Sequence, residues 1–201
     1  MEIYSFKLKS KTNSNVFVVT TSDGEFILHS DIIVKYKLEK GLVNSNVLFE
    51  AVQESEILIG LNLSLKYISS KLKTEKQIKD YLYKKEFHKH TVEKILEKLK
   101  EYNVVNDNVY AESYAASNPN FSKNKIKQKL MLAGVKSDLS ETAVQNIDDD
   151  ASCLKHAEKY MRNKIVDKQT IEKLIRRLQG MGYNWDTINH TLKHIKCDLE
   201  E

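Results

Sequence analysis

A pattern that recurs every 48 residues constrains the fold of this 201-residue chain more than any other feature of its sequence. Between Thr74 and Leu99, apolar residues follow one another at spacings of three and four, in two series separated by a break at residues 86–89. This spacing places the apolar residues on one face of a helix, so the stretch predicts a helix, a short turn and a second helix. Thr74 and Gln77 form a capping-box pattern, which predicts that the first helix begins just after Thr74.

The pattern returns twice without gaps when the frame is shifted by 48 residues, the difference between Ile126 and Ile78. The aligned apolar columns are Ile78, Ile126 and Leu174; Leu82, Leu130 and Leu178; Leu96, Val144 and Leu192; and Leu99, Ile147 and Ile195. In the turn between the two helices the column is Glu86, Gly134 and Gly182. Three copies in register predict a tandem helical repeat protein, with three-helix units stacked into an elongated array.

Polar residues at fixed places in the repeats predict where the helices begin. Thr74, Ser122 and Thr170 share a column and are expected to be N-caps. Asp138 and Asp186 share another column and are expected to cap the last helix of their repeats.

The N-terminal segment has a different pattern, which predicts strands. Residues 3–9 alternate between apolar and polar, and residues 16–21 and 25–29 flank Asp23-Gly24, a two-residue hairpin signal. A short helix is expected to begin at Ser30 or Asp31 and to be ended by Gly41. A sheet this small has too little core of its own, so we expect it to pack against the first repeat.

These patterns together predict a mainly α protein in four parts. The N-terminal β extension with its short helix covers residues 1–43, and the three repeats cover 44–104, 105–148 and 149–201. Repeat one opens with a helical region from Asn44 or Ser45 to about Leu72, and the first helices of the other repeats are expected at about 107–116 and 150–162. Asp148 to Asp150 are expected to cap the last of these helices.

The net charge of +4 is divided unevenly along the chain. Residues 61–138 carry 16 Lys against 9 acidic residues, whereas residues 1–60 carry 6 Lys against 8 acidic residues. Basic residues recur near the capped helix of each repeat, which predicts a basic stripe able to hold a polyanion or an acidic protein face. The candidate binding residues are Lys71, Lys73 and Lys76 in repeat one, Lys123, Lys125, Lys127 and Lys129 in repeat two, and Lys173, Arg176 and Arg177 in repeat three.

Residue types suited to catalysis or metal binding form no complete motif. His190, His194 and Cys197 are spaced along one face of the last predicted helix, but they lack the Glu that a zinc-protease motif requires. No Walker, GxSxG or GxGxxG motif is present, so we expect no enzyme, no cofactor and no metal. The chain has no apolar run of the roughly 20 residues that cross a bilayer and no secretory signal pattern, and its two cysteines suit a reducing cytoplasm.

Several stretches resemble the RecX family, the bacterial regulators of the RecA recombinase. Residues 65–82 are similar to the family's opening motif, residues 105–111 to its join between the first two repeats, and residues 122–135 to its next signature. The hairpin at Asp23-Gly24 with the residues up to Gly41 resembles the N-terminal extension of Firmicute members. The chain departs from the pattern at Asn106, where the family commonly has an Asp, and at Asn120-Phe121, which replaces a Lys-Gly.

The resemblance implies a negative regulator that lies along the groove of the RecA–DNA filament and hinders RecA's recombination and ATP hydrolysis, in DNA repair and the SOS response. The expected partner is the RecA filament, with single- or double-stranded DNA as a further one, and the protein is expected to be a cytoplasmic monomer. A different class remains open: a nucleic-acid-binding helical repeat protein with no recombinase partner. Binding that requires RecA favours the first, and salt-sensitive binding to bare DNA favours the second.

Overall fold

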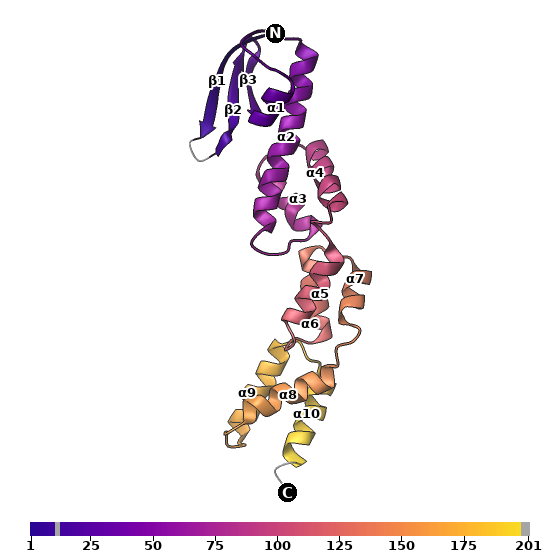
Figure 1. The fold of residues 1–201 in the computed structure, drawn as a ribbon. Helices are drawn as coiled ribbons and strands as arrows, with labels where there is room; N and C mark the ends of the chain where they lie inside the picture. The colour runs from indigo at the N-terminus through magenta and orange to yellow at the C-terminus, as the bar shows by residue number, and fades with distance from the viewer. Residues whose placement is uncertain (11–12, 198–201) are drawn as a thin grey trace. The chain divides into compact units, whose positions relative to one another are not determined.

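The computed structural model describes residues 1–10 and 13–197, with residues 13, 14, 196 and 197 described by their backbone alone. Ten helices and four strands lie in this part of the chain, so the prediction of a mainly helical protein with an N-terminal antiparallel sheet is confirmed. The chain divides into two compact units, Met1–Val105 and Asn106–Glu201 (Figure 1). The finer division into four parts remains a prediction.

The first unit opens with an antiparallel sheet in the order β3-β2-β1-β4. Its strands are β1 (Glu2–Ser10), β2 (Asn13–Thr21), β3 (Gly24–His29) and β4 (Gly41–Leu42). The predicted hairpin is present, but Thr21 pairs with Gly24, so its loop residues are Ser22 and Asp23, one position earlier than expected. Gly24 has φ +135°, a backbone conformation that favours glycine, and it begins the returning strand.

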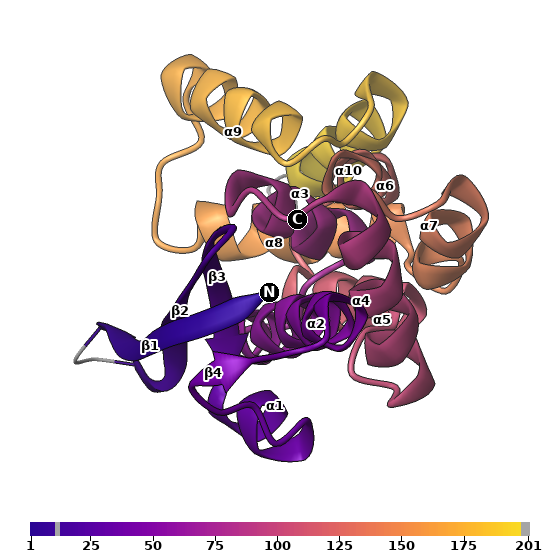
Figure 2. The same ribbon diagram turned by 90° about the horizontal axis from the view of Figure 1, so that it is seen from above.

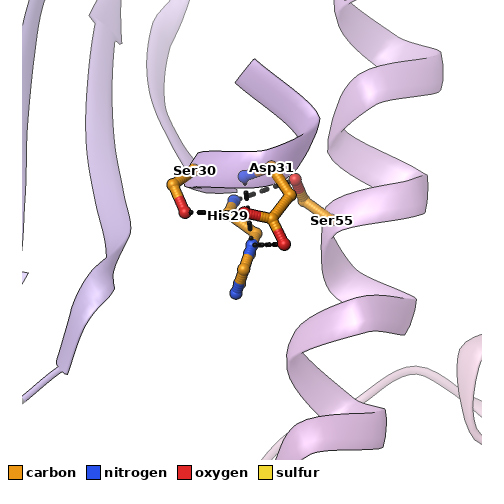
Figure 3. Close-up of polar contacts among 4 residues, drawn as sticks. All are labelled: His29, Ser30, Asp31 and Ser55. Carbon is orange, nitrogen blue, oxygen red and sulfur yellow. Dashed lines mark hydrogen bonds and ion pairs between the residues drawn. The ribbon is translucent and has the colours of Figure 1, made fainter. Parts of the chain in front are cut away.

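The short helix α1 (Ser30–Lys35) differs from its prediction at both ends. Neither Ser30 nor Asp31 is its N-cap; His29 is, because its Nδ1 accepts a hydrogen bond from the backbone N–H of Asp31 at 3.2 Å (Figure 3). The helix ends at Lys35 rather than at Gly41. Gly41 instead has φ +116° and begins β4, the two-residue strand that pairs with β1 and that the sequence pattern did not indicate.

The long helix α2 (Ser45–Ile68), capped by Asn44, takes part in both cores of the first unit. Its first half contributes Leu48 and Ala51 to a core with the sheet and α1, and Figure 2 shows the three long strands on one side of this helix. Its second half packs Ile57 and Leu61 against the next two helices. The sheet therefore packs on the first helix of repeat one, as predicted, although α2 ends at Ile68, four residues before the expected Leu72.

The helix-turn-helix predicted after Thr74 is confirmed as α3 (Glu75–Lys84) and α4 (Lys89–Glu101). Thr74 and Gln77 close the expected capping box: the Thr74 Oγ1 accepts the Gln77 N–H at 3.2 Å, and the Gln77 Oε1 accepts the Thr74 N–H at 3.3 Å. Glu86 in the turn has φ +65°, which an L residue adopts only at some cost.

The second unit holds two further helix triplets (Figure 1). The helices are α5 (Asp107–Ser117), α6 (Lys123–Ala133), α7 (Ser137–Val144), α8 (Asp149–Met161), α9 (Lys168–Gly180) and α10 (Trp185–Cys197). One core gathers residues of α5, α6 and α7, and a separate core gathers residues of α8, α9 and α10. With α2, α3 and α4 these helices make three triplets in the described part of the chain.

Three of the predicted caps in this unit are wrong by a few residues. Thr170 lies in the first turn of α9, and Asp167 is the cap, because its Oδ1 accepts the Thr170 N–H at 2.7 Å. Asp138 and Asp186 also lie in first turns, where a negative charge still favours the positive end of the helix dipole. Asp148 caps α8 as expected.

Two of the four aligned apolar columns, those that begin with Ile78 and Leu82, occupy equivalent environments. Every side chain of both columns is 0% exposed: Ile78, Ile126, Leu174, Leu82, Leu130 and Leu178. The 48-residue register therefore reports real core positions.

Candidate interaction surfaces on the repeats

The three candidate lysines of repeat one surround the start of α3. Lys71 and Lys76 are exposed, and Lys73 is half-buried, with its Nζ 4.5 Å from the ring centroid of Tyr67. Because Lys71 and Lys73 precede the cap and Lys76 lies in the first turn of the helix, these side chains present positive charge to solvent at one corner of the first unit.

An aromatic pair that the sequence pattern did not reveal lies beside this corner. The rings of Tyr67 and Tyr81 are parallel to within 8° with centroids 4.3 Å apart. Lys73 lies over Tyr67, and the Nζ of Lys85 lies 6.0 Å from the Tyr81 ring centroid. Both tyrosines pack against the core of α2, α3 and α4, so they serve a contact between helices. Lys85 lies outside the recurring columns, although it follows Tyr81 by four residues, a spacing that places neighbours together on a helix.

The four candidate lysines of α6 are not alike. Lys129 is exposed. Lys127 is half-buried and forms an ion pair with Glu141 of α7, and Lys123 donates its backbone N–H to Asp149 Oδ1 at 2.9 Å. Lys125 is half-buried; its Nζ donates to the carbonyl of Gly180 at the end of α9 and lies 5.0 Å from the Phe121 ring centroid. Lys125 therefore joins two repeats within the second unit, in addition to carrying charge.

The contact between α6 and the end of α9 is closed by several hydrogen bonds. The Ser122 N–H donates to the carbonyl of Met181 at 3.0 Å, and the Ser122 hydroxyl donates to that of Gly182 at 2.6 Å. The Tyr183 hydroxyl donates to the carbonyl of Asn120 at 3.2 Å. Burial raises the pKa of Tyr183 to about 12, so this hydroxyl stays protonated and able to donate at physiological pH.

The candidate residues of α9 form a basic face with an aromatic centre. Lys173 and Arg176 are exposed, and Arg176 lies 3.6 Å from Glu172. The Arg177 Nε donates to His156 Nε2 at 3.2 Å and its guanidinium lies over the Tyr160 ring. Lys164, which the repeat pattern did not indicate, also lies over Tyr160. Desolvation, followed by the charges of Arg177 and Lys159, lowers the pKa of His156, so this imidazole is held neutral as an acceptor.

The basic candidates thus lie in both compact units, those of α3 in the first and those of α6 and α9 in the second. Within the second unit, the Lys125 bond to Gly180 brings the start of α6 beside the end of α9. A single stripe that runs through all three repeats remains a prediction.

The residues considered for a metal give no described cluster. His190 and His194 lie on α10 with ring centroids 4.7 Å apart, and the side chain of Cys197 lies outside the described residues. Among the residues that the structure describes, no three His, Cys, Asp or Glu side chains are grouped to hold an ion. The absence of a bound metal therefore remains a prediction. In the same part of the chain, no helix has both the length and the apolar character needed to span a bilayer.

The fold and these surfaces define a class: a helical repeat protein with an N-terminal sheet and basic corners on its repeats. The family model of the first three-helix domain of RecX matches residues 61–99, which run from the end of α2 through α4. The regulatory protein RecX of Clostridium perfringens strain SM101 is 31% identical over 203 residues, which cover 96% of each chain. That of Streptococcus uberis is 30% identical over 202 residues, which cover 96% of this chain and 78% of the relative.

The chain therefore belongs to the RecX family of regulatory proteins. Its relatives are named as regulatory proteins and not as enzymes. A crystal structure of RecX from Lactobacillus salivarius is also similar, with a TM-score of 0.61 and 25% sequence identity, covering 71% of this chain and 97% of that one. A second RecX crystal structure, 18% identical, covers 96% of this chain with a TM-score of 0.65 and supports the fold.

Proposed function

We propose that this protein binds along the groove of the RecA–DNA filament and lowers RecA's recombination and ATP hydrolysis, without catalysing a reaction itself. The observation that carries the proposal is membership of a regulatory family over nearly the whole chain. The resemblance of its motifs to the RecX pattern supplies RecA as the partner.

The basic corners support a mechanism of many weak contacts. Exposed lysines and arginines at the start of α3 and on α9 can meet acidic protein surfaces or the phosphates of bound DNA. Separate corners on one chain raise each other's effective concentration, so individually weak contacts add up to stable binding. In this proposal the protein acts as a cytoplasmic monomer and needs no cofactor.

The structure sharpens the choice of residues for a test. Lys125 and Lys127 hold internal contacts, so their reversal would confound binding with folding. Lys71→Glu with Lys73→Glu in the first unit, and Lys173→Glu with Arg176→Glu in the second, change charge at exposed or half-buried sites. Each pair is expected to weaken inhibition of RecA's ATP hydrolysis on single-stranded DNA, and more strongly at low salt, where screening is weakest.

The matched control is Lys7→Glu with Lys9→Glu on β1, which makes the same change in charge at exposed positions away from the repeats. Each variant is titrated against RecA at two salt concentrations, and circular dichroism checks its helicity. Folded variants that inhibit as well as the parent would reject the basic corners as the contact surface. Strong binding of the parent to bare DNA, without any need for RecA, would favour the nucleic-acid-binding alternative.

A further inference from the structure

His29 is a buried residue whose polar groups are only partly used by the fold. It is 4% exposed, and its backbone N–H donates to the hydroxyl of the fully buried Ser55 at 3.0 Å. Its Nδ1 accepts the backbone N–H of Asp31 at 3.2 Å and lies 3.6 Å from the Asp31 carboxylate (Figure 3). These contacts fix the ring at the start of α1, with Nδ1 committed to the cap.

The second ring nitrogen, Nε2, is left for another partner. Because Nδ1 accepts a hydrogen bond, the neutral imidazole carries its proton on Nε2, which is therefore a donor. Figure 3 shows Nε2 at the end of the ring that points away from Asp31. Among the described residues, no acceptor forms a hydrogen bond with Nε2. No described side-chain polar atom that is fully shielded from solvent lacks a partner, so Nε2 is not fully shielded and reaches open space.

That space is a cavity of about 410 Å³ between β2 and the second half of α2. It is lined by His29 together with Asn15, Val16, Ile59, Asn62, Leu63 and Lys66. The α2 residues are spaced by three, one and three positions, so they form one stripe of the helix. Ser55, which holds the His29 backbone, continues the stripe one turn earlier. This stripe is separate from Ile57 and Leu61, which face the core of repeat one.

The chemistry of the lining selects an anion with a hydrocarbon stem. The His29 Nε2–H, the Asn62 amide and the Lys66 ammonium are donors, and none of the described lining residues carries a carboxylate. Val16, Ile59 and Leu63 supply apolar walls between these donors. A carboxylate on a short aliphatic chain matches both the donors and the apolar walls, because its oxygens accept charge-assisted hydrogen bonds while its methylenes contact the walls.

The surrounding charge favours a protein over a nucleic acid as the source of that carboxylate. Residues 1–60, which form the sheet, α1 and the first part of α2, carry 6 Lys against 8 acidic residues. This excess of negative charge repels a continuous polyanion but hinders a single acidic side chain much less.

We propose that the cavity between β2 and α2 binds a single Glu or Asp side chain of a partner protein, with His29 Nε2 at its base and Lys66 at its rim. This site is distinct from the basic corners of the repeats and does not depend on the proposed function.

The test uses two capped hexapeptides as probes, Ala-Leu-Glu-Glu-Leu-Ala and its counterpart with Gln in place of both Glu. Nuclear magnetic resonance of ¹⁵N-labelled full-length protein follows the His29 ring nitrogens and the Asn62 side-chain amide during titration. The Glu peptide is expected to shift both signals saturably, and the Gln peptide to shift them much less. Lys66→Gln and Asn62→Leu are each expected to weaken binding by about threefold to tenfold, as for the loss of one hydrogen bond.

The matched control for His29 is His29→Asn. Asn is among the best N-caps, so it keeps an acceptor for the Asp31 N–H and the backbone bond to Ser55, while Nε2 is lost. Peptide binding is expected to fall while thermal stability is retained. If His29→Asn unfolds, the Lys66→Gln and Asn62→Leu variants, at exposed positions of α2, still test the proposal. Equal binding of the Gln peptide, or no shift at His29, would overturn the proposal. Selective shifts with a thymidine oligonucleotide in place of the Glu peptide would overturn it too, because the occupant would then be a phosphate.

Discussion

The starts of α3 and α6 are equivalent in the repeat, but the third residue of each helix, Gln77 or Lys125, makes a different contact. At the start of α3, Thr74 and Gln77 exchange hydrogen bonds with each other's backbone, which makes a capping box. At the start of α6, Ser122 accepts the Lys125 N–H at 3.2 Å, but its own N–H and hydroxyl donate to Met181 and Gly182. The cap of α6 is therefore shared with the end of α9.

The residue 48 positions after Gln77 is Lys125, and it shows what this difference means. Gln77 completes a capping box within its own helix, whereas Lys125 reaches the Gly180 carbonyl at the end of another helix. A cation suits that place, because the last carbonyls of a helix carry partial negative charge. One column of a repeat can thus hold a local cap in one copy and an inter-repeat contact in the next.

The largest expected effect compares the cores behind these two caps. Leu82→Ala and Leu130→Ala each remove a fully buried side chain, so each is expected to lower the free energy of unfolding by about 2–5 kcal/mol. Hydrogen exchange followed residue by residue separates them. Leu130→Ala should also reduce protection at Met181–Tyr183, because α6 is bonded to that turn, whereas Leu82→Ala should leave the turn unchanged. Equal protection of the turn in both variants would break the comparison.

The second prediction concerns the turn column. Gly182 has φ +88°, and an added Cβ would lie 2.6 Å from the Lys125 Cβ and 2.8 Å from the Ser122 Oγ. Gly182→Ala is therefore expected to destabilise the second unit by about 1–3 kcal/mol, through backbone strain and overlap together. The same column holds Glu86 at φ +65°, so Glu86→Gly should stabilise the first unit by about 0.5–1 kcal/mol. Thermal unfolding measures both changes in stability, and midpoint shifts of the same sign for the two variants would contradict the prediction.

The third prediction separates the two cap contacts directly. Lys125→Met keeps the aliphatic chain but loses the bond to Gly180, and should cost about 0.5–1.5 kcal/mol. Gln77→Ala opens the capping box of α3 at a cost of about 0.5–1 kcal/mol. Chemical denaturation gives the two values, and exchange at Gly180 and Met181 should rise only in the Lys125 variant. Unchanged exchange there would show that the ammonium does not hold the end of α9.

The smallest expected effect is a dependence on pH that is confined to the second unit. The pKa of His156 lies below its ordinary value of 6.5, mainly because of desolvation, with Arg177 and Lys159 adding to the shift. Between the folded and unfolded pKa values the unfolded chain binds more protons, so the free energy of unfolding rises with pH and falls as the pH drops through 6.5. His156→Gln keeps an acceptor for Arg177 but cannot titrate, so it should flatten this slope. An identical slope in the variant would assign the dependence to other groups.

The sequence predicted most of the helical fold because buried positions must be apolar, and equivalent positions are buried in each repeat. Leu82, Leu130 and Leu178 could be equated from spacing alone. Helix starts were predicted less well, because several polar residues near each start can cap and only the backbone path selects one. That ambiguity led to Thr170 in place of Asp167, and to Ser30 or Asp31 in place of His29.

The candidate surface shows the same limit. The sequence located basic residues near each capped helix, since their types and spacing are visible in the chain. It could not separate exposed Lys129 from Lys125, which is bonded to Gly180, because that distinction depends on which helix end lies within reach. Lys85 and Lys164 were missed because they lie outside the repeating columns, although each follows by four residues the tyrosine whose ring it covers, Tyr81 and Tyr160.

The sequence by itself determined the class of this protein: the 48-residue register, the N-terminal hairpin and the family pattern are all properties of the order of residues along the chain. Tertiary structure alone decided that α2 serves two cores, that the cap of α6 is completed by the end of α9, and that His29 faces the cavity between β2 and α2. The physical reason is that periodicity records which side of an element is buried, whereas a hydrogen bond between distant segments depends on positions in space that no local pattern encodes.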